Sequence, residues 1–217
     1  MAGSSPGNIL EILCTEDPPS VYAGFALRPL TPAQMKSISS TVASQGIAAV
    51  VQLPVDTYTA RLPAEAGSRI LLLEDVQDPG NVGTLIRTAA AFDYSGIILT
   101  DKCADPFSPK CLQSTAGSIL SLWVRRTASY LDLVDELRSS GHVLAAADLR
   151  GQASAAMLNK YNSLVLALGN EAAGLSEALL NKSDHRVKIP IKRTKAESLN
   201  VAACGAICMY LSSLDRP

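Results

Sequence analysis

The sequence has almost no net charge and no long run of apolar residues. Its 217 residues include 19 Lys and Arg against 20 Asp and Glu, which gives a formal net charge of −1. This balance offers no overall electrostatic reason to expect a nucleic-acid partner, so such a partner would need a local basic patch. No apolar run approaches the roughly 18 residues of a membrane span, and the first residues, MAGSSPGN, do not resemble a signal peptide. We therefore expect a cytoplasmic protein without a membrane partner.

The cysteines lack the spacing of a metal site. No CxxC or similar zinc-binding pattern occurs among them, so no metal is expected. Cys204 and Cys208 would share a helix face, but the sequence around them is rich in Ala and Ile, which favours buried, inert thiols over ligands or a disulfide. The five cysteines are Cys14, Cys103, Cys111, Cys204 and Cys208.

The composition is that of a globular α/β protein. Apolar residues make up 47% and charged residues 18%, and the length suits one well-buried domain with a small appendage. From about residue 70, short apolar runs alternate with helical patterns, which predicts a mostly parallel sheet with helices on both faces. The expected strands are Ile70–Leu73, Ile97–Thr100, Leu122–Val124, Val143–Ala147, Leu164–Leu168 and Arg186–Ile191. The expected helices are Val82–Phe92, Pro109–Thr115, Tyr130–Ser139, Leu175–Leu180 and Leu199–Leu211.

The first 60 residues have a different pattern. Ser20–Leu27 and Gly46–Leu53 are predicted strands, with a polar helix, Pro32–Val42, between them. The segment is too short for a large core of its own. We expect residues 1–60 to form a short, partial α+β segment that resembles a substrate-recognition domain. A linker would then lead to about residue 68, and residues 69–217 would form the main domain.

The segment Leu73–Phe92 predicts a buried strand, a tight turn and a helix. Ligands bind at the carboxyl ends of the strands in open α/β sheets, where such turns lie. Asn81 and Arg87 place an amide and a permanent cation near the start of this helix. They suggest a place where polar or anionic substrate is handled.

A second segment, Leu164–Ser176, also ends a predicted strand. Gly169 would let the backbone approach a ligand closely, and Asn170 and Glu171 would put an amide and a carboxylate at the edge of the sheet. The simpler alternative is that Gly169-Asn170 is only a favourable turn.

A third segment, Val187–Ala203, combines a strand end with a basic loop. Ser198 is expected to cap the long helix that follows. Asn200 is a poor residue for a helix start unless its side chain has a role. The alternatives are an ordinary cap and an ordinary solvated loop. The basic residues are Lys188, Lys192, Arg193 and Lys195.

Together, in this order, the three segments resemble the motifs of the SpoU (TrmH-type) branch of the SPOUT methyltransferases. These enzymes methylate the ribose 2′-hydroxyl of RNA with S-adenosylmethionine. The likeness extends from about residue 70 to the C-terminus. The first motif corresponds to Asn81, Gly83 and Arg87. The second corresponds to Gly169, Asn170, Glu171, Gly174, Leu175 and Ser176. The third corresponds to Ile189, Pro190, Glu197, Ser198, Leu199, Asn200 and Val201.

The resemblance implies a deep trefoil knot at the C-terminus and a homodimer with the last helix in its interface. It also implies that the substrate is rRNA or, less readily, tRNA. The residues that it assigns to the cofactor are Leu168, Gly169, Asn170, Gly174, Ile189, Pro190, Ser198, Leu199 and Asn200. Those it assigns to catalysis are Asn81, Arg87, Glu171, Ser198 and Asn200. Those expected to bind RNA are Arg87, Lys192, Arg193 and Lys195.

The resemblance makes Arg87 the central catalytic residue, sometimes assigned as the base. A guanidinium stays protonated in proteins, so our preferred hypothesis is that Arg87 binds the target phosphate and stabilises the developing 2′-oxyanion. His142 and His185 lie outside the three motifs, and structural roles are expected for both.

Two other functions are alternatives to RNA methylation. An NAD-dependent dehydrogenase should carry G-x-G-x-x-G after the first strand, whereas the segment Pro79–Gly83 reads PGNVG with no third glycine in place. A non-catalytic RNA-binding protein that kept the fold is the alternative from a different class. S-adenosylmethionine binding would separate these two functions from the methyltransferase.

Overall fold

The computed structural model describes residues 8–39, 44–192 and 194–214. The chain divides into two units, Met1–Val55 and Asp56–Pro217, which are described separately. No helix in the described part of the chain is long and apolar enough to cross a membrane.

The first unit is a three-stranded sheet with one helix. Its strands are β1 (Ile9–Cys14), β2 (Leu27–Pro29) and β3 (Ile47–Val51). Their order is β2-β1-β3, with β2 parallel and β3 antiparallel to β1. The helix α1 (Pro32–Ile38) begins at a capping box in which the Thr31 and Gln34 side chains each accept from the other residue's backbone N–H.

The prediction for this unit is partly confirmed. Strand β3 lies within the predicted range 46–53. The predicted strand over residues 20–27 is wrong, because residues 20–22 form a 3-10 turn, η2, and β2 begins only at Leu27. Strand β1 was not predicted. The helix is shorter than expected because Ser39 is already extended, and residues 40–42 lie outside the described part.

The second unit contains a seven-stranded sheet in the order β6-β5-β4-β9-β7-β10-β8, and all its strand pairings are parallel. Its strands are β4 (Arg69–Leu73), β5 (Gly96–Leu99), β6 (Trp123–Arg126), β7 (Val143–Ala147), β8 (Ala153–Ser154), β9 (Leu164–Leu168) and β10 (His185–Lys188). The predicted parallel sheet is confirmed, although the short strand β8 was not predicted and β10 ends at Lys188, three residues before the predicted end.

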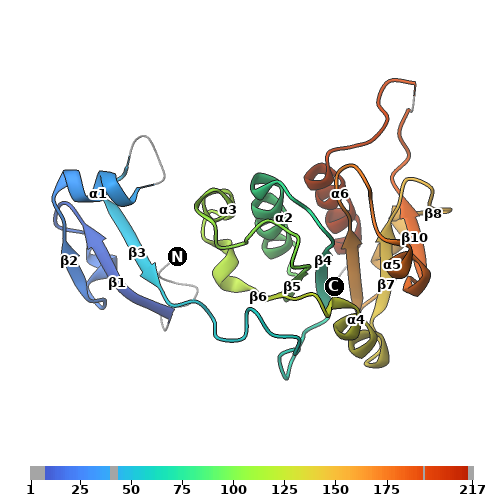
Figure 1. The fold of residues 1–217 in the computed structure, drawn as a ribbon, viewed down its shortest axis with the longest axis horizontal. Coiled ribbons are helices and arrows are strands. Elements are labelled where there is room, and N and C mark those ends of the chain that lie inside the picture. Colours follow the sequence, from blue (N-terminus) through green and yellow to red (C-terminus); the bar gives the residue numbers. More distant parts are fainter. Residues whose placement is uncertain (1–7, 40–43, 193, 215–217) are drawn as a thin grey trace. The chain divides into compact units, whose positions relative to one another are not determined.

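Helices cover both faces of this sheet (Figure 1). The helical elements are α2 (Pro79–Ala91), α3 (Pro109–Thr115), η3 (Ser118–Ser121), α4 (Tyr130–Ser139), η4 (Ala155–Lys160), α5 (Glu177–Lys182) and α6 (Val201–Ser213). Alternate residues of the buried strand β4 point to opposite faces. Leu71 and Leu73 join the cluster under α2, α3 and α6, whereas Ile70 and Leu72 join the cluster under α4 and α5.

The ends of three helices differ from the prediction because capping side chains set them. Asp78 accepts from the Asn81 backbone N–H at 3.0 Å, so α2 begins at Pro79. Ser176 caps α5 in the same way, at 3.2 Å from the Leu179 N–H. The expectation that Ser198 caps α6 is wrong. Asn200 is the cap, and its Oδ1 accepts from the backbone N–H groups of Ala202 and Ala203 at 2.8 and 3.2 Å.

Helix α6 packs closely on α2 and β9. A Cβ added at Gly205 would lie 2.3 Å from Leu85 Cδ2 and 2.6 Å from Leu168 Cδ1, closer than any real contact. Glycine at this position therefore lets α6 approach the sheet, and the approach brings the start of α6 next to the carboxyl ends of the central strands.

Most of the predicted linker belongs to the second unit, which begins at Asp56. Trp123 Nε1 donates to the Ala66 carbonyl at 2.9 Å, and Arg125 Nε donates to the Arg61 carbonyl at 2.6 Å. Leu62 and Ala66 also pack against the core cluster under α4 and α5. Residues 61–66 are thus bound along β6.

Candidate active site

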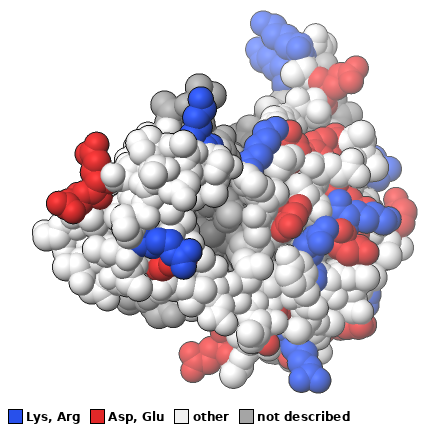
Figure 2. Space-filling view, turned by 60° about the vertical axis from the view of Figure 1, so that its left-hand side comes forward, with Lys and Arg blue, Asp and Glu red and all other residues white. Residues whose placement is uncertain are grey.

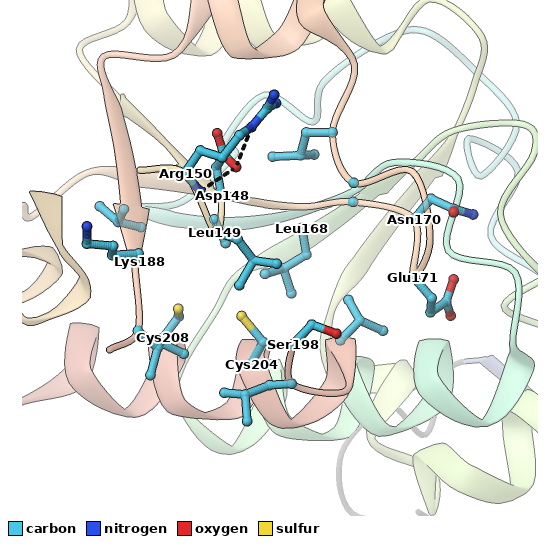
Figure 3. A pocket seen from close by; sticks show the side chains of 18 of the residues that line it. Asp148, Leu149, Arg150, Leu168, Asn170, Glu171, Lys188, Ser198, Cys204 and Cys208 are labelled. Carbon is cyan, nitrogen blue, oxygen red and sulfur yellow. Dashed lines mark hydrogen bonds and ion pairs between the residues drawn. The ribbon is translucent and has the colours of Figure 1, made fainter. Parts of the chain in front are cut away.

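The second and third segments singled out in the sequence line one cavity of about 560 Å³ at the carboxyl edge of the sheet (Figure 3). The first segment joins them through Asn81, which is hydrogen-bonded to Glu171 and Asn200 in the cavity wall. Its walls come from residues 147–150, 168–175, 187–189 and 198–201, together with Leu180, Ile191, Cys204 and Cys208. Of the residues expected to hold the cofactor, all line this cavity except Pro190. A cavity of this size accommodates a ligand of several hundred daltons.

A buried carboxylate joins two of the segments. Glu74 follows β4 and is 4% exposed. It accepts hydrogen bonds from the Ser176 backbone N–H at 2.6 Å, from the Ser176 hydroxyl at 2.7 Å and from the Tyr130 hydroxyl. Its own N–H donates to the Leu168 carbonyl at 2.9 Å. Burial and the bond to Glu74 raise the pKa of Tyr130 to about 12, so Tyr130 remains a donor at neutral pH.

Sequence reasoning did not assign Glu74 a role. The available signal was an acidic residue placed directly after a continuously apolar strand. Such a residue must be either exposed or paired, and the structure shows that it is paired.

The turn after β9 is built by Asn170. Its Oδ1 accepts from the backbone N–H groups of Ala172 and Ala173, both at 2.9 Å, and its Nδ2 donates to the Asp75 carbonyl at 2.8 Å. Its backbone exchanges two hydrogen bonds with Gly174, at 3.1 and 2.9 Å. The side chain of Asn170 is therefore occupied in holding the turn, as the simpler interpretation of this segment expected.

Gly169 allows the two sides of this turn to touch. A Cβ there would lie 2.3 Å from the Gly174 carbonyl carbon and 2.5 Å from the Leu175 nitrogen. These neighbours are backbone atoms, which cannot turn aside as a flexible side chain can. Any other residue at position 169 must therefore displace the wall of the cavity.

Three predicted catalytic residues form a continuous chain of hydrogen bonds. Asn81 Nδ2 donates to Glu171 Oε1 at 3.0 Å, and Asn200 Nδ2 donates to Asn81 Oδ1 at 3.1 Å. The three residues come from α2, from the turn after β9 and from the cap of α6. The same Asn200 side chain therefore caps a helix with its oxygen and holds Asn81 with its nitrogen.

The other two predicted catalytic residues lie apart from this chain. Arg87 is exposed on α2, about 9 Å along the helix axis from Asn81. It is not among the residues that line the cavity, and it makes no hydrogen bond or ion pair with any residue that the structure describes. Ser198 is exposed and lines the cavity.

The predicted basic loop lies between β10 and α6. Lys192 and Lys195 are exposed, and the Lys195 N–H donates to the Lys192 carbonyl at 2.9 Å. Arg193 lies outside the described residues. Basic side chains project at the top of the view in Figure 2, where this loop lies, with an acidic group beside them, and the rest of the visible face also carries both signs of charge.

Both histidines make structural contacts away from the cavity. His142 Nε2 lies 2.8 Å from the Gly67 carbonyl. His185 Nε2 lies 2.7 Å from the Tyr161 hydroxyl, and the two rings stack. Among the described residues, no group of three or more His, Cys, Asp or Glu side chains could hold a metal ion.

The cavity has the features that an apolar ligand with a few polar groups requires. Leu168, Leu175, Ile189 and Leu199 supply apolar wall. Asp148 Oδ1 accepts from the Arg150 N–H at 2.9 Å, whereas its buried Oδ2 has no hydrogen-bond partner among the described residues. Unpaired buried acceptors are rare, and this one belongs to a residue that lines the cavity.

A parallel α/β sheet with a cavity at its carboxyl edge is the arrangement in which doubly wound α/β proteins bind their ligands, nucleotides among them. Residues 68–210 match the model of the SpoU rRNA Methylase family. The chain belongs to this family.

Two relatives with named activities are similar to most of this chain. The chain is 37% identical over 212 residues to the 23S rRNA (guanosine(2553)-2'-O)-methyltransferase RlmP of Bacillus subtilis, covering 95% of this chain and 81% of that protein. It is 33% identical over 175 residues to the 23S rRNA (uridine(2479)-2'-O)-methyltransferase of Streptomyces viridochromogenes, covering 78% of this chain and 60% of that protein.

Solved structures agree with this assignment. The SpoU methyltransferase AviRb from Streptomyces viridochromogenes, in complex with AdoMet, has a TM-score of 0.80 at 26% identity and covers 94% of this chain and 82% of its own. The AdoMet-bound rRNA methyltransferase from Sinorhizobium meliloti has a TM-score of 0.78 at 27% identity, and the match covers 94% of this chain and 79% of that one.

Proposed function

We propose that the chain transfers the methyl group of S-adenosylmethionine to a ribose 2′-hydroxyl of RNA, with rRNA preferred over tRNA as substrate. The observation that carries this proposal is that the second and third family segments line one cavity, and that the hydrogen-bonded chain Glu171–Asn81–Asn200 joins the first segment to them. The relatives named as 23S rRNA 2'-O-methyltransferases and the structures with AdoMet bound support it. Action on rRNA would place the protein in the cytoplasm.

The cavity would hold the cofactor through the backbone near Leu168, Gly169, Ile189 and Leu199. Gly169 and Asp148 both line the cavity, and Asp148 Oδ2 has no hydrogen-bond partner among the described residues. The remaining contacts would come from Asn170, Gly174, Pro190, Ser198 and Asn200. S-adenosylmethionine, when bound, supplies an activated methyl group on a sulfonium.

The protein must then hold the ribose hydroxyl about 3 Å from that methyl group, in line with the bond that breaks. Asn81 is fixed from both sides by Glu171 and Asn200, so it can orient a ribose or phosphate group with little loss of side-chain freedom. The guanidinium of Arg87 would neutralise the target phosphate and the developing 2′-oxyanion. Lys192, Arg193 and Lys195 would bind the RNA backbone next to the site.

The second unit would act as a homodimer with α6 in the interface. Ile207 and Tyr210 on α6 are 37% and 52% exposed, and the Tyr210 ring lies 6.1 Å from that of Phe92. Exposed apolar side chains on one helix face are suited to a protein contact. Arg87 is exposed and does not line its own cavity, which fits a role at the partner's cavity.

Two features of the chain's organisation belong to the same proposal. The C-terminal segment that carries the second and third motifs would form a trefoil knot. Residues 1–60 would form a substrate-recognition segment, followed by a linker and by the methyltransferase domain over residues 69–217. The agreement with RlmP over 95% of this chain supports a function that uses both units.

Replacing Gly169 by alanine tests the location of the cofactor. The new Cβ would lie 2.3 Å from the Gly174 backbone, so the wall must move and the affinity for S-adenosylmethionine should fall by at least about tenfold, the equivalent of about 1.4 kcal/mol. Isothermal titration calorimetry measures this change. The matched control is Gly24→Ala, where no atom lies within 4 Å of the new Cβ. Unchanged affinity in Gly169→Ala would show that the cofactor binds elsewhere. If the unaltered chain does not bind S-adenosylmethionine, the result would favour a non-catalytic RNA-binding protein.

Replacing Arg87 by lysine tests the role of the guanidinium. Lysine keeps the charge but loses the planar, two-pronged donor group. The rate of methyl transfer to rRNA in a single turnover should fall by about 10²–10³-fold, as for the loss of one oxyanion donor. Arg61→Lys, an exposed position away from the cavity, should leave the rate unchanged. A near-normal rate in Arg87→Lys at neutral pH would contradict the role given to Arg87.

Placing a negative charge on the exposed face of α6 tests whether this helix forms the dimer interface. Sedimentation equilibrium of the unaltered chain should give twice the monomer mass of 22.8 kDa, and Tyr210→Asp should shift it to the monomer because a carboxylate would be desolvated in the interface. Tyr58→Asp is the matched control, since Tyr58 is similarly exposed at 54% outside α6. A monomer before substitution, or a dimer that survives it, would reject α6 as the interface.

A further inference from the structure

Two thiols in the cavity wall have no part in the proposed methyl transfer. Cys204 and Cys208 lie four residues apart on α6, which places them on one face of the helix. Both line the cavity, and Figure 3 shows their sulfur atoms projecting from α6 towards it. The prediction that both are buried is confirmed for Cys208 and is wrong for Cys204, which is partly exposed.

The two thiols are not equivalent. Cys208 is 1% exposed, so its ionised form would be poorly solvated. A hydrogen bond from Cys208 lowers the pKa of Cys204, whereas this bond and burial raise the pKa of Cys208. Cys204 is therefore the thiol that ionises first, and the thiolate is the reactive form of cysteine.

The position of Cys204 in α6 also favours ionisation of its thiol. Its backbone N–H donates to the Asn200 carbonyl at 2.9 Å, which places Cys204 at the end of the first turn of α6. That turn contains no acidic residue, and a helix N-terminus favours negative charge. The charged side chains that line the cavity with Cys204 are two of each sign: Asp148, Glu171, Arg150 and Lys188.

The other cysteines differ from Cys204 in burial. Cys14, Cys103 and Cys111 are all buried. Burial raises the pKa of Cys103, and it raises the pKa of Cys111 to about 12. Cys204 is therefore the cysteine that we expect to react at neutral pH.

We propose that Cys204 is a modification site whose occupation by a small disulfide and occupation of the cavity by the cofactor exclude one another. The Cys204 proton passes to solvent, and the thiolate attacks one sulfur of the disulfide. The S–S bond breaks, a mixed disulfide forms on Cys204 and the other half leaves as a thiolate. The adduct then fills space between α6 and the turn after β9. The reactive thiol is argued from the partial exposure of Cys204 in the cavity wall and from its place in α6, together with the pKa directions of the cysteines, whereas the competition rests on the proposed function of the cavity.

The reactivity is tested on the full chain with 5,5′-dithiobis(2-nitrobenzoate), which releases one coloured thiolate for each protein thiol modified. One thiol should react at least about tenfold faster than the other four, since each unit of pKa changes the thiolate fraction about tenfold. The fast phase should be lost in Cys204→Ser and retained in Cys14→Ser.

Peptide mapping by mass spectrometry after a short exposure locates the adduct in the unaltered chain, so the result does not depend on how a variant folds. A fast phase that maps to another cysteine, or five equally slow thiols, would overturn the reactive site.

Competition is tested with S-adenosylhomocysteine, which cannot transfer a methyl group. At about twenty times its dissociation constant it should slow the fast phase about twentyfold, in proportion to the fraction of free protein. Binding in calorimetry without protection of Cys204 would overturn the mutual exclusion. No binding in calorimetry would instead reject the proposed function, and the mapping experiment would still decide whether Cys204 is the reactive thiol.

Discussion

The buried carboxylate of Glu74 is the interaction on which the site depends. A carboxylate that is 4% exposed must be fully hydrogen-bonded to be tolerated, and Glu74 finds its donors in Ser176 and Tyr130. Ser176 in turn caps α5. The end of β4, the turn after β9 and the start of α5 are thus held at one point, and the turn after β9 is a wall of the cavity.

The site also shares residues with the local structure that supports it. Asn200 caps α6 and holds Asn81, while Asn170 closes its own turn and reaches the backbone at Asp75. Gly205 and Gly169 allow the close contacts of helix on sheet and of backbone on backbone. A substitution at one of these positions would therefore change stability and ligand binding together, which distinguishes them from Arg87, whose exposed side chain supports no other part of the fold.

The sequence predicted the sheet of the second unit well because its strands have a strong signal. Strands β4 and β9 are buried on both faces and are continuously apolar, and their positions needed no knowledge of tertiary contacts. Strand β1 was missed, and residues 20–27 were wrongly assigned as a strand, because the small first unit has weak patterns and its pairing is set by β1 itself. The cap of α6 was misplaced by two residues because Ser198 and Asn200 are both favourable caps.

The candidate site was predictable only as three separate segments. Their resemblance to a family indicated that they belong together, but the bonds that join them span 90 to 119 residues and leave no local trace. Glu74 and Cys204 could not be assigned from the sequence for the same reason. The role of Glu74 depends on donors 56 and 102 residues away. The exposure of Cys204 depends on which face of α6 meets the sheet.

The comparison of Glu74→Ala with Glu74→Gln tests the central claim most directly. In Glu74→Ala the Ser176 and Tyr130 donors lose their acceptor, so the free energy of unfolding should fall by about 3 kcal/mol, and S-adenosylhomocysteine binding should be lost in calorimetry. Glu74→Gln keeps one acceptor oxygen and should retain part of the stability and part of the binding affinity. The exposed control Glu65→Ala should change neither stability nor binding. Unchanged stability and unchanged binding in Glu74→Ala would contradict the account.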